Sequence, residues 1–123
     1  MTNKVFVYGT LKGGNQLRGM NKFANATLVD DATTSDAEYS LYDLGAFPAV
    51  SMGGKNRIQG EVWQVDADIM QQLDYIEGYP EFYDRKKINT TAGEAWVYYI
   101  PHIQEYQNVT AITAAPSHSL SWN

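Results

Sequence analysis

The chain has 123 residues, of which 44% are hydrophobic, and this size fits one domain with a single hydrophobic core. Its formal net charge is −5 at pH 7 and it has no long run of basic residues, which argues against binding to nucleic acid or to an anionic membrane surface. It contains no cysteine, which excludes disulfide bonds, thiol catalysis and thiolate metal sites.

The first predicted element is a strand at residues 4–8, which are mostly β-branched and aromatic, as in a buried strand. The N-terminal residues lack the long apolar stretch of a signal peptide, and no later segment approaches the length of a transmembrane helix. We therefore expect a cytoplasmic protein. The strand stops at Tyr8-Gly9-Thr10-Leu11, and backbone N–H groups exposed at such a strand end are able to hold an anionic or carbonyl oxygen.

Two strands are predicted next, at residues 26–30 and 38–43. In the second of them, Tyr39 and Leu41 would share one face, because side chains alternate along a strand. The glycine and the proline within residues 44–50 indicate a turn or bulge before another short strand.

A β-hairpin is predicted around the turn signal Met-Gly-Gly-Lys at residues 52–55. It would pair residues 49–51 with residues 57–64. In the longer strand, Glu61 and Trp63 would lie on the same face of the sheet.

The one convincing helix is predicted at residues 68–76. Asp66 is a good N-cap, and Gly78 is placed as the glycine that ends the helix. Apolar residues at the spacing i, i+4, i+7 would face the core, namely Ile69, Leu73 and Ile76.

Two further strands are predicted at residues 82–88 and 94–100, after which the chain turns polar. Because strands dominate and flank the one good helix, we expect the α+β class: a β-rich single domain built as a small mixed-strand barrel with one main helix packed on it. The domain would span residues 4–110, and residues 111–123 would form a weakly ordered C-terminal tail.

Glu77 ends the predicted helix immediately before Gly78. The helix macrodipole disfavours a negative charge at this end by roughly 0.3–1 kcal/mol, and Asp74, three residues earlier, adds like-charge repulsion. Both effects favour a carboxyl group that can accept and return a proton near neutral pH. Taken alone, Glu77 is more simply interpreted as a solvated helix-end carboxylate, and the segment from Tyr8 fits an ordinary strand exit as well as it fits a binding loop.

Other chemistries find little support in the sequence. The loop after residue 8 has neither the spacing of a Walker phosphate-binding loop nor that of a dinucleotide-binding fingerprint. Two histidines lack a serine or cysteine nucleophile as partner and are interpreted as surface residues, His102 and His118. Four acidic residues could together hold a hard cation, but their spacing matches no ligand pattern and no metal site is predicted from Asp74, Glu77, Glu81 and Asp84.

Several segments together resemble the γ-glutamylcyclotransferase-like family, also called AIG2-like. They are, in order, residues 5–11 (VFVYGTL), 42–50 (YDLGAFPAV), 58–63 (IQGEVW), 73–80 (LDYIEGYP) with 83–85 (YDR), and 95–98 (AWVY). No single motif is decisive, but the ordered set is specific and covers roughly residues 4–100.

The resemblance implies a small mixed barrel with a cavity at one end. It implies that Glu77 is the catalytic acid–base residue and that a loop binds the glutamyl group. The residues that it implies for substrate binding are the loop residues Tyr8, Gly9, Thr10 and Leu11 and the cavity-lining Tyr83 and Tyr98. It further implies a small-molecule γ-glutamyl substrate, no metal and no cofactor.

The implied activity is that of a γ-glutamyl cyclotransferase, an amide-cleaving lyase or acyltransferase. The α-amine of a γ-glutamyl compound attacks its own γ-carbonyl and forms 5-oxoproline, so no serine or cysteine nucleophile is needed. Two alternatives stay open, a non-catalytic module that binds a small metabolite and a γ-glutamyl amide hydrolase. The leaving amine also stays open between an amino acid, a polyamine or lysine-type amine and a modified metabolite, as does the choice between monomer and homodimer.

Overall fold

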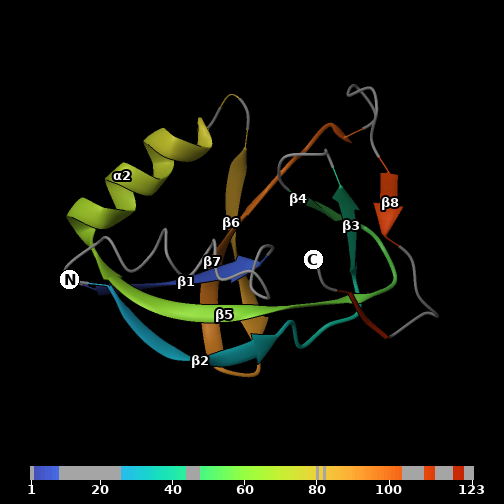
Figure 1. The fold of residues 1–123 in the computed structure, drawn as a ribbon, viewed down its shortest axis with the longest axis horizontal. Helices are drawn as coiled ribbons and strands as arrows, with labels where there is room; N and C mark the ends of the chain where they lie inside the picture. The colour runs from blue at the N-terminus through green and yellow to red at the C-terminus, as the bar shows by residue number, and fades with distance from the viewer. Residues whose placement is uncertain are drawn as a thin grey trace.

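The structure, a computed structural model, describes residues 2–8, 26–43, 48–79, 81, 83–103, 110–112 and 118–120. Within these residues it contains one α-helix and nine strands (Figure 1). The elements are β1 (Thr2–Tyr8), β2 (Thr27–Thr33), β3 (Tyr39–Asp43), β4 (Pro48–Met52), β5 (Arg57–Asp66), α2 (Ala67–Glu77), β6 (Asp84–Thr90), β7 (Gly93–Tyr99), β8 (Thr110–Ile112) and β9 (Ser119–Leu120).

The described strands form two sheets. The larger has the order β2-β5-β1-β7-β6, with β9 paired to β5, and the smaller has the order β4-β3-β8. Within the larger sheet β1 runs parallel to β7 and antiparallel to β5. Figure 1 shows α2 on one side of the long strand β5, with β3, β4 and β8 gathered near the other end of that strand. The predicted α+β class and β-rich single domain are confirmed.

The predicted barrel is wrong, because the sheets do not close through the described residues. The outer strands of the larger sheet, β2 and β6, approach each other at one isolated bridge between Thr34 and Thr90. A ladder between them does not continue beyond this bridge. The sheet is therefore strongly curved, while β3, β4 and β8 form a sheet of their own.

The predicted hairpin between β4 and β5 is also wrong. β4 pairs with β3, with Val50 opposite Leu41. The backbone N–H groups of Gly53 and Gly54 both donate to the carbonyl oxygen of Glu38 at 2.9 and 3.0 Å. Gly53 has a φ of 88°, a conformation that glycine adopts without strain. The turn therefore carries the chain past β3 into the other sheet instead of back along β4.

Helix α2 begins and ends as its sequence predicts. The side chain of Asp66 accepts a hydrogen bond from the Ile69 N–H at 2.9 Å, and Gly78 ends the helix in the left-handed conformation. Ile69 and Leu73 are buried as expected, and Met70 is buried beside them. The Ile76 side chain lies outside the described residues. α2 is too short to cross a membrane, and none of the described residues form a helix that is long and apolar enough to do so.

The core has two parts, one on each face of the larger sheet. One face packs against α2 and includes Val5, Val7, Trp63 and Val65. The other face packs against the smaller sheet and includes Phe6, Ile58 and Val62 together with Leu41 and Val50. Part of the predicted tail also belongs to this second core, because β9 pairs with β5 and Leu120 is buried.

Candidate active site

A row of five residues crosses the larger sheet on the face that packs against α2. The strand pairing places Asp31 opposite Glu61, Glu61 opposite Val7, and Arg85 opposite Tyr98. Val5 pairs with Trp96 in the parallel strands β1 and β7, so Val7 and Tyr98 lie side by side two residues further on. We call these residues the cross-sheet row; its order is Asp31, Glu61, Val7, Tyr98 and Arg85.

One end of the cross-sheet row is bonded to α2 through Asp74. The Tyr98 hydroxyl donates to Oδ1 of Asp74 at 2.6 Å, and Nη1 of Arg85 forms an ion pair with the same oxygen at 3.2 Å. The Arg85 guanidinium also lies over the rings of Tyr79 and Trp96, 4.8 and 4.7 Å from their centroids. These contacts fix the last turns of α2, and hence the backbone of Glu77, against β6 and β7.

The ion pair changes the electrostatic argument for Glu77. The sequence predicts that Asp74 repels a charge on Glu77, but Arg85 compensates the negative charge of Asp74. The predicted repulsion by Asp74 is therefore weakened, whereas the general effect of the macrodipole at a helix end is unchanged. The same contacts engage Asp74 as a structural partner, and no group of three His, Cys, Asp or Glu side chains suited to a metal ion occurs among the described residues.

Tyr98 is a permanent hydrogen-bond donor in this network. Burial raises the pKa of its hydroxyl strongly, and the neighbouring Asp74 carboxylate raises the pKa further. Tyr98 therefore stays protonated at physiological pH and holds Asp74 through its O–H group.

The other two tyrosines predicted for the site contact the backbone of the smaller sheet. The Tyr8 hydroxyl donates to the carbonyl oxygen of Tyr98 at 2.6 Å and accepts from the Val50 N–H at 3.2 Å. The Tyr83 hydroxyl donates to the carbonyl oxygen of Pro48 at 2.8 Å. The hydroxyl groups of Tyr8 and Tyr83 thus contact the backbone of β4, whereas the Tyr98 hydroxyl contacts α2 and only the Tyr98 backbone carbonyl meets Tyr8.

The structure does not test the positions of the remaining predicted site residues. Gly9, Thr10 and Leu11 lie outside the described residues, as does the side chain of Glu77. Their joint site, with the carboxyl group facing the loop backbone, stays a prediction.

Glu61 is a polar residue of this face that the sequence did not single out. It is 6% exposed, and Nε1 of Trp63 donates to its Oε1 at 3.1 Å. Burial raises the pKa of the Glu61 carboxyl, the Trp63 hydrogen bond lowers it, and the Asp31 charge raises it. The available signal was a glutamate directly before the apolar Val62 and Trp63 of β5, because glutamate is rarely fully buried unless it is paired.

Residues 5–122 match the family described as "Gamma-glutamyl cyclotransferase, AIG2-like". The chain belongs to this family. It is 40% identical over 98 residues to the "Putative gamma-glutamylcyclotransferase" of Vibrio cholerae, which covers 80% of the chain and 82% of that relative. It is 34% identical to the "Gamma-glutamylcyclotransferase family protein YtfP" of Escherichia coli, over 77% of the chain and 80% of the relative.

Solved structures in this family share the fold. The solution structure of ytfP from Escherichia coli has a TM-score of 0.66 and 30% identity, and the match covers 94% of each chain. An AIG2-like protein from Mus musculus has a TM-score of 0.68 at 21% identity, over 80% of the chain and 76% of that protein, which shows likeness of fold alone. The family resemblance seen in the sequence is confirmed.

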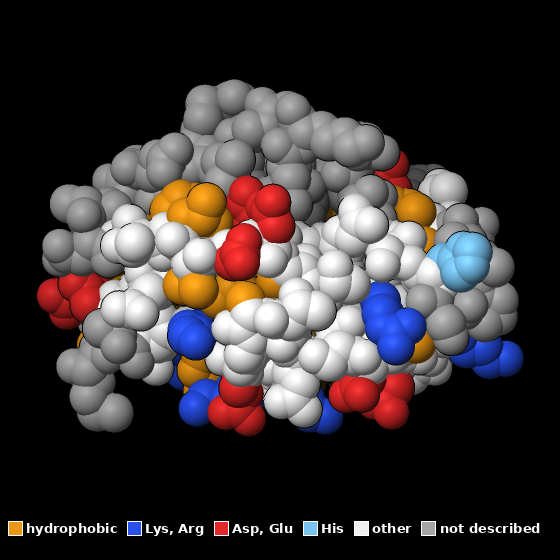
Figure 2. Space-filling view, turned by 90° about the horizontal axis from the view of Figure 1, so that it is seen from below, with side chains coloured by type: hydrophobic (Ala, Val, Ile, Leu, Met, Phe, Trp, Pro, Cys, Tyr) orange, Lys and Arg blue, Asp and Glu red, His pale blue; other side chains and the backbone are white. Residues whose placement is uncertain are grey.

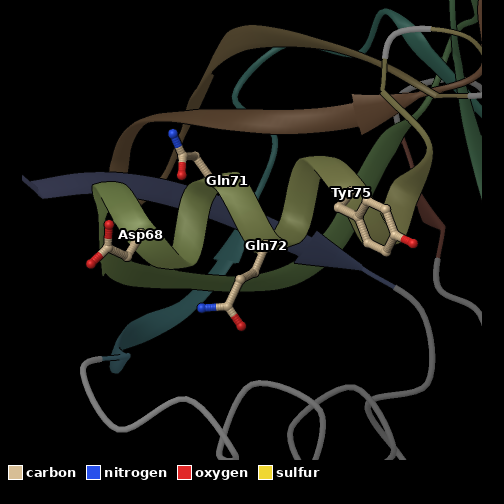
Figure 3. Close-up of a pocket in the computed structure, with 4 residues that line it drawn as sticks. All are labelled: Asp68, Gln71, Gln72 and Tyr75. Atoms are coloured by element: carbon tan, nitrogen blue, oxygen red, sulfur yellow. The ribbon is translucent and has the colours of Figure 1, made fainter.

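A hollow on α2 lies apart from the cross-sheet row. Figure 3 shows the residues that line it, with Asp68 in the first turn of α2, Gln71 and Gln72 in the middle and Tyr75 near the end. None of the four belongs to the buried face of the helix, and Tyr75 is 88% exposed. On the face shown in Figure 2, basic and acidic side chains are interspersed and neither sign forms a continuous patch.

Proposed function

We propose that the protein is a γ-glutamyl cyclotransferase that converts a γ-glutamyl compound into 5-oxoproline and a free amine. The observation that carries the proposal is the anchoring of the end of α2, where Asp74 is held by Tyr98 and Arg85 three residues before Glu77. A proton-transfer group needs this kind of fixed support, because catalysis falls steeply when a reacting group is misplaced. The names of the relatives support the same activity.

In the proposed reaction the substrate supplies its own nucleophile. The α-amine nitrogen forms a bond to the γ-carbonyl carbon, and the bond from that carbon to the leaving nitrogen breaks. The α-ammonium loses two protons on its way to the lactam N–H, and the leaving nitrogen gains two as it becomes an ammonium ion. Glu77 relays these protons, accepting them from the α-nitrogen and returning them to the leaving nitrogen.

The loop after β1 binds the substrate in this proposal. Backbone N–H groups of Gly9, Thr10 and Leu11 hold either the α-carboxylate or the oxyanion that develops on the γ-carbonyl. We further propose that Tyr8, Tyr83 and Tyr98 line the substrate cavity; their hydroxyl groups are engaged in hydrogen bonds within the protein. The partner is a small γ-glutamyl compound and no cofactor takes part.

The experiment that tests the proposal is product analysis with a panel of γ-glutamyl compounds. The panel contains γ-glutamyl amino acids, γ-glutamyl polyamines and γ-glutamyl-lysine-type amides, with mass-spectrometric detection of products. We expect 5-oxoproline and one free amine. Glutamate as the product would replace the proposal by amide hydrolysis, and binding without turnover would replace it by a metabolite-binding module.

A further inference from the structure

Glu61 carries a buried carboxylate to which the proposed reaction assigns no role. Its Oε1 accepts one hydrogen bond, from the Trp63 indole. No lysine, arginine or histidine among the described residues forms an ion pair with it. The charge that acts on it most directly is that of Asp31 on the neighbouring strand, and this charge has the same sign.

A carboxylate in this setting is costly for the protein alone. Burial without a compensating cation disfavours an ionised group, and an apolar side chain of similar size is usually neutral or stabilising at such a place. Val7 and Trp63, which lie on the same face beside Glu61, show that apolar side chains fit there. The cost would be offset if a cation from outside the chain came to lie against Glu61.

The position of Glu61 in the sheet points to the kind of cation that could lie against it. Glu61 is directly opposite Val7, one residue before β1 ends and the predicted glutamyl-binding loop begins. Tyr98 lies on the other side of Val7 in the same cross-sheet row. Neighbouring strands are about 4.8 Å apart, so the backbones of Glu61 and Tyr98 are roughly 10 Å apart. The carboxylate of Glu61 thus lies at the edge of the region where the glutamyl group is proposed to bind.

We propose that Glu61 binds the α-ammonium group of the γ-glutamyl substrate, a role that rests on the function proposed above. A glutamyl group carries an ammonium and a carboxylate on the same carbon. Glu61 on the ammonium orients this carbon relative to the γ-carbonyl. The chain that ends in the γ-carbonyl then folds back toward the amine, and Glu77 removes the proton.

The test measures binding in a Glu77→Gln background, so that no turnover occurs. The two probes are γ-glutamyl-methylamide and glutaric acid mono-methylamide, which has hydrogen in place of the α-amine. Neither carries a charge on the leaving group, so a difference between them reports on the α-ammonium alone. Calorimetry gives the dissociation constant of each probe.

We expect Glu61→Gln to weaken binding of γ-glutamyl-methylamide by about 10- to 100-fold, the effect of losing a hydrogen bond to a charged group. Binding of glutaric acid mono-methylamide should change less than about twofold, because it has no group for Glu61 to hold. This second value also shows that the variant is folded. Glu94→Gln removes the same charge from the exposed part of β7 and should change neither value.

Glu61→Met provides a second uncharged side chain of similar length, so the test does not depend on one variant folding. The proposal is overturned if Glu61→Gln weakens both probes equally, or neither, or if the unmodified site binds both probes equally well. Product analysis separates this proposal from the proposed function. If 5-oxoproline forms but Glu61 has no effect on the preference for γ-glutamyl-methylamide over glutaric acid mono-methylamide, the ammonium site alone is overturned. If that preference depends on Glu61 but no 5-oxoproline forms, the proposed reaction alone is overturned.

Discussion

The Tyr98 hydroxyl and the Asp74 carboxylate are 2.6 Å apart, and this contact joins strand β7 to the last turns of helix α2. Arg85 adds an ion pair to the same carboxylate oxygen. The three residues come from three different elements, and the helix ends three residues after Asp74, at Glu77. The end of α2 is therefore fixed by buried and partly buried polar contacts in addition to its apolar face.

Tyr98→Phe should lower the free energy of unfolding by about 1–2 kcal/mol, because it removes a hydrogen bond to a charged group and leaves Asp74 with one partner fewer. The catalytic rate kcat should fall more than KM changes, since the network positions Glu77. Denaturant titration and steady-state kinetics measure the two effects. Tyr75→Phe makes the same chemical change on an exposed side chain and should stay within about 0.5 kcal/mol. Equal effects of the two variants would show that the network has no special part in stability.

Glu77→Gln should keep the fold and reduce kcat by roughly 10²–10⁴-fold, the range for a positioned acid–base group. Glutamine has nearly the same shape but cannot accept the proton of the ammonium. Glu81→Gln is the matched control, because Glu81 is an exposed carboxylate four residues further on. Near-normal turnover by folded Glu77→Gln protein would move the proton transfers to another residue, with Glu61 as the first to examine.

Arg85→Met should shift the acid limb of the pH dependence of kcat/KM to higher pH. Without the guanidinium, the charge of Asp74 is uncompensated three residues from Glu77, and like charges at this helix spacing repel. A base in this setting loses its proton at higher pH. Adding Asp74→Asn should move the limb back, because the second change removes the repelling charge. A limb that stays in place in both variants would show that Asp74 and Glu77 do not interact.

Much of the fold follows from local sequence signals. Asp66 and Gly78 mark the ends of α2 because capping depends on residues only a few positions apart. The pairing of β4 is different, since both β3 and β5 were available to it. Its pairing with β3 is accompanied by hydrogen bonds from the Gly53 and Gly54 N–H groups to the Glu38 carbonyl oxygen, a contact across the turn that residue types alone do not reveal.

The site was predictable only in part for the same reason. Tyr8 and Tyr98 were candidates from the family motifs and stay predictions, whereas the link from Asp74 to Arg85 depends on how α2 lies over β6 and β7. Glu61 shows the limit most clearly. Its strand and face were predictable from alternation, whereas its burial became visible only once the register placed it between Asp31 and Val7.

Glu61 should also make stability depend on pH in a recognisable way. Its folded-state pKa is raised, first by burial and then by Asp31, so the folded protein binds the proton more tightly than the unfolded chain. Stability therefore falls as pH rises from the unfolded-state pKa, about 4.3, up to the raised folded-state pKa. Glu61→Gln removes the titrating group and with it this loss of stability. The free energy of unfolding of the variant minus that of the parent protein should therefore increase as pH rises across that window. Denaturant titrations at several pH values test this, and a pH-independent difference would contradict the raised pKa.

The mechanism itself predicts that blocking the α-amine stops the reaction while the scissile amide is still present. An N-acetyl-γ-glutamyl compound should be inert, whereas its unblocked parent should release 5-oxoproline and a free amine. The acetyl group could also prevent binding by its size, so a smaller substrate is the decisive control. The des-amino analogue, with hydrogen in place of the α-amine, meets no steric barrier in a site that accepts the parent. At concentrations high enough to saturate the site it should also be inert, because it lacks the nucleophile. Cleavage of this analogue at a rate comparable to the parent would exclude cyclisation and establish attack by water.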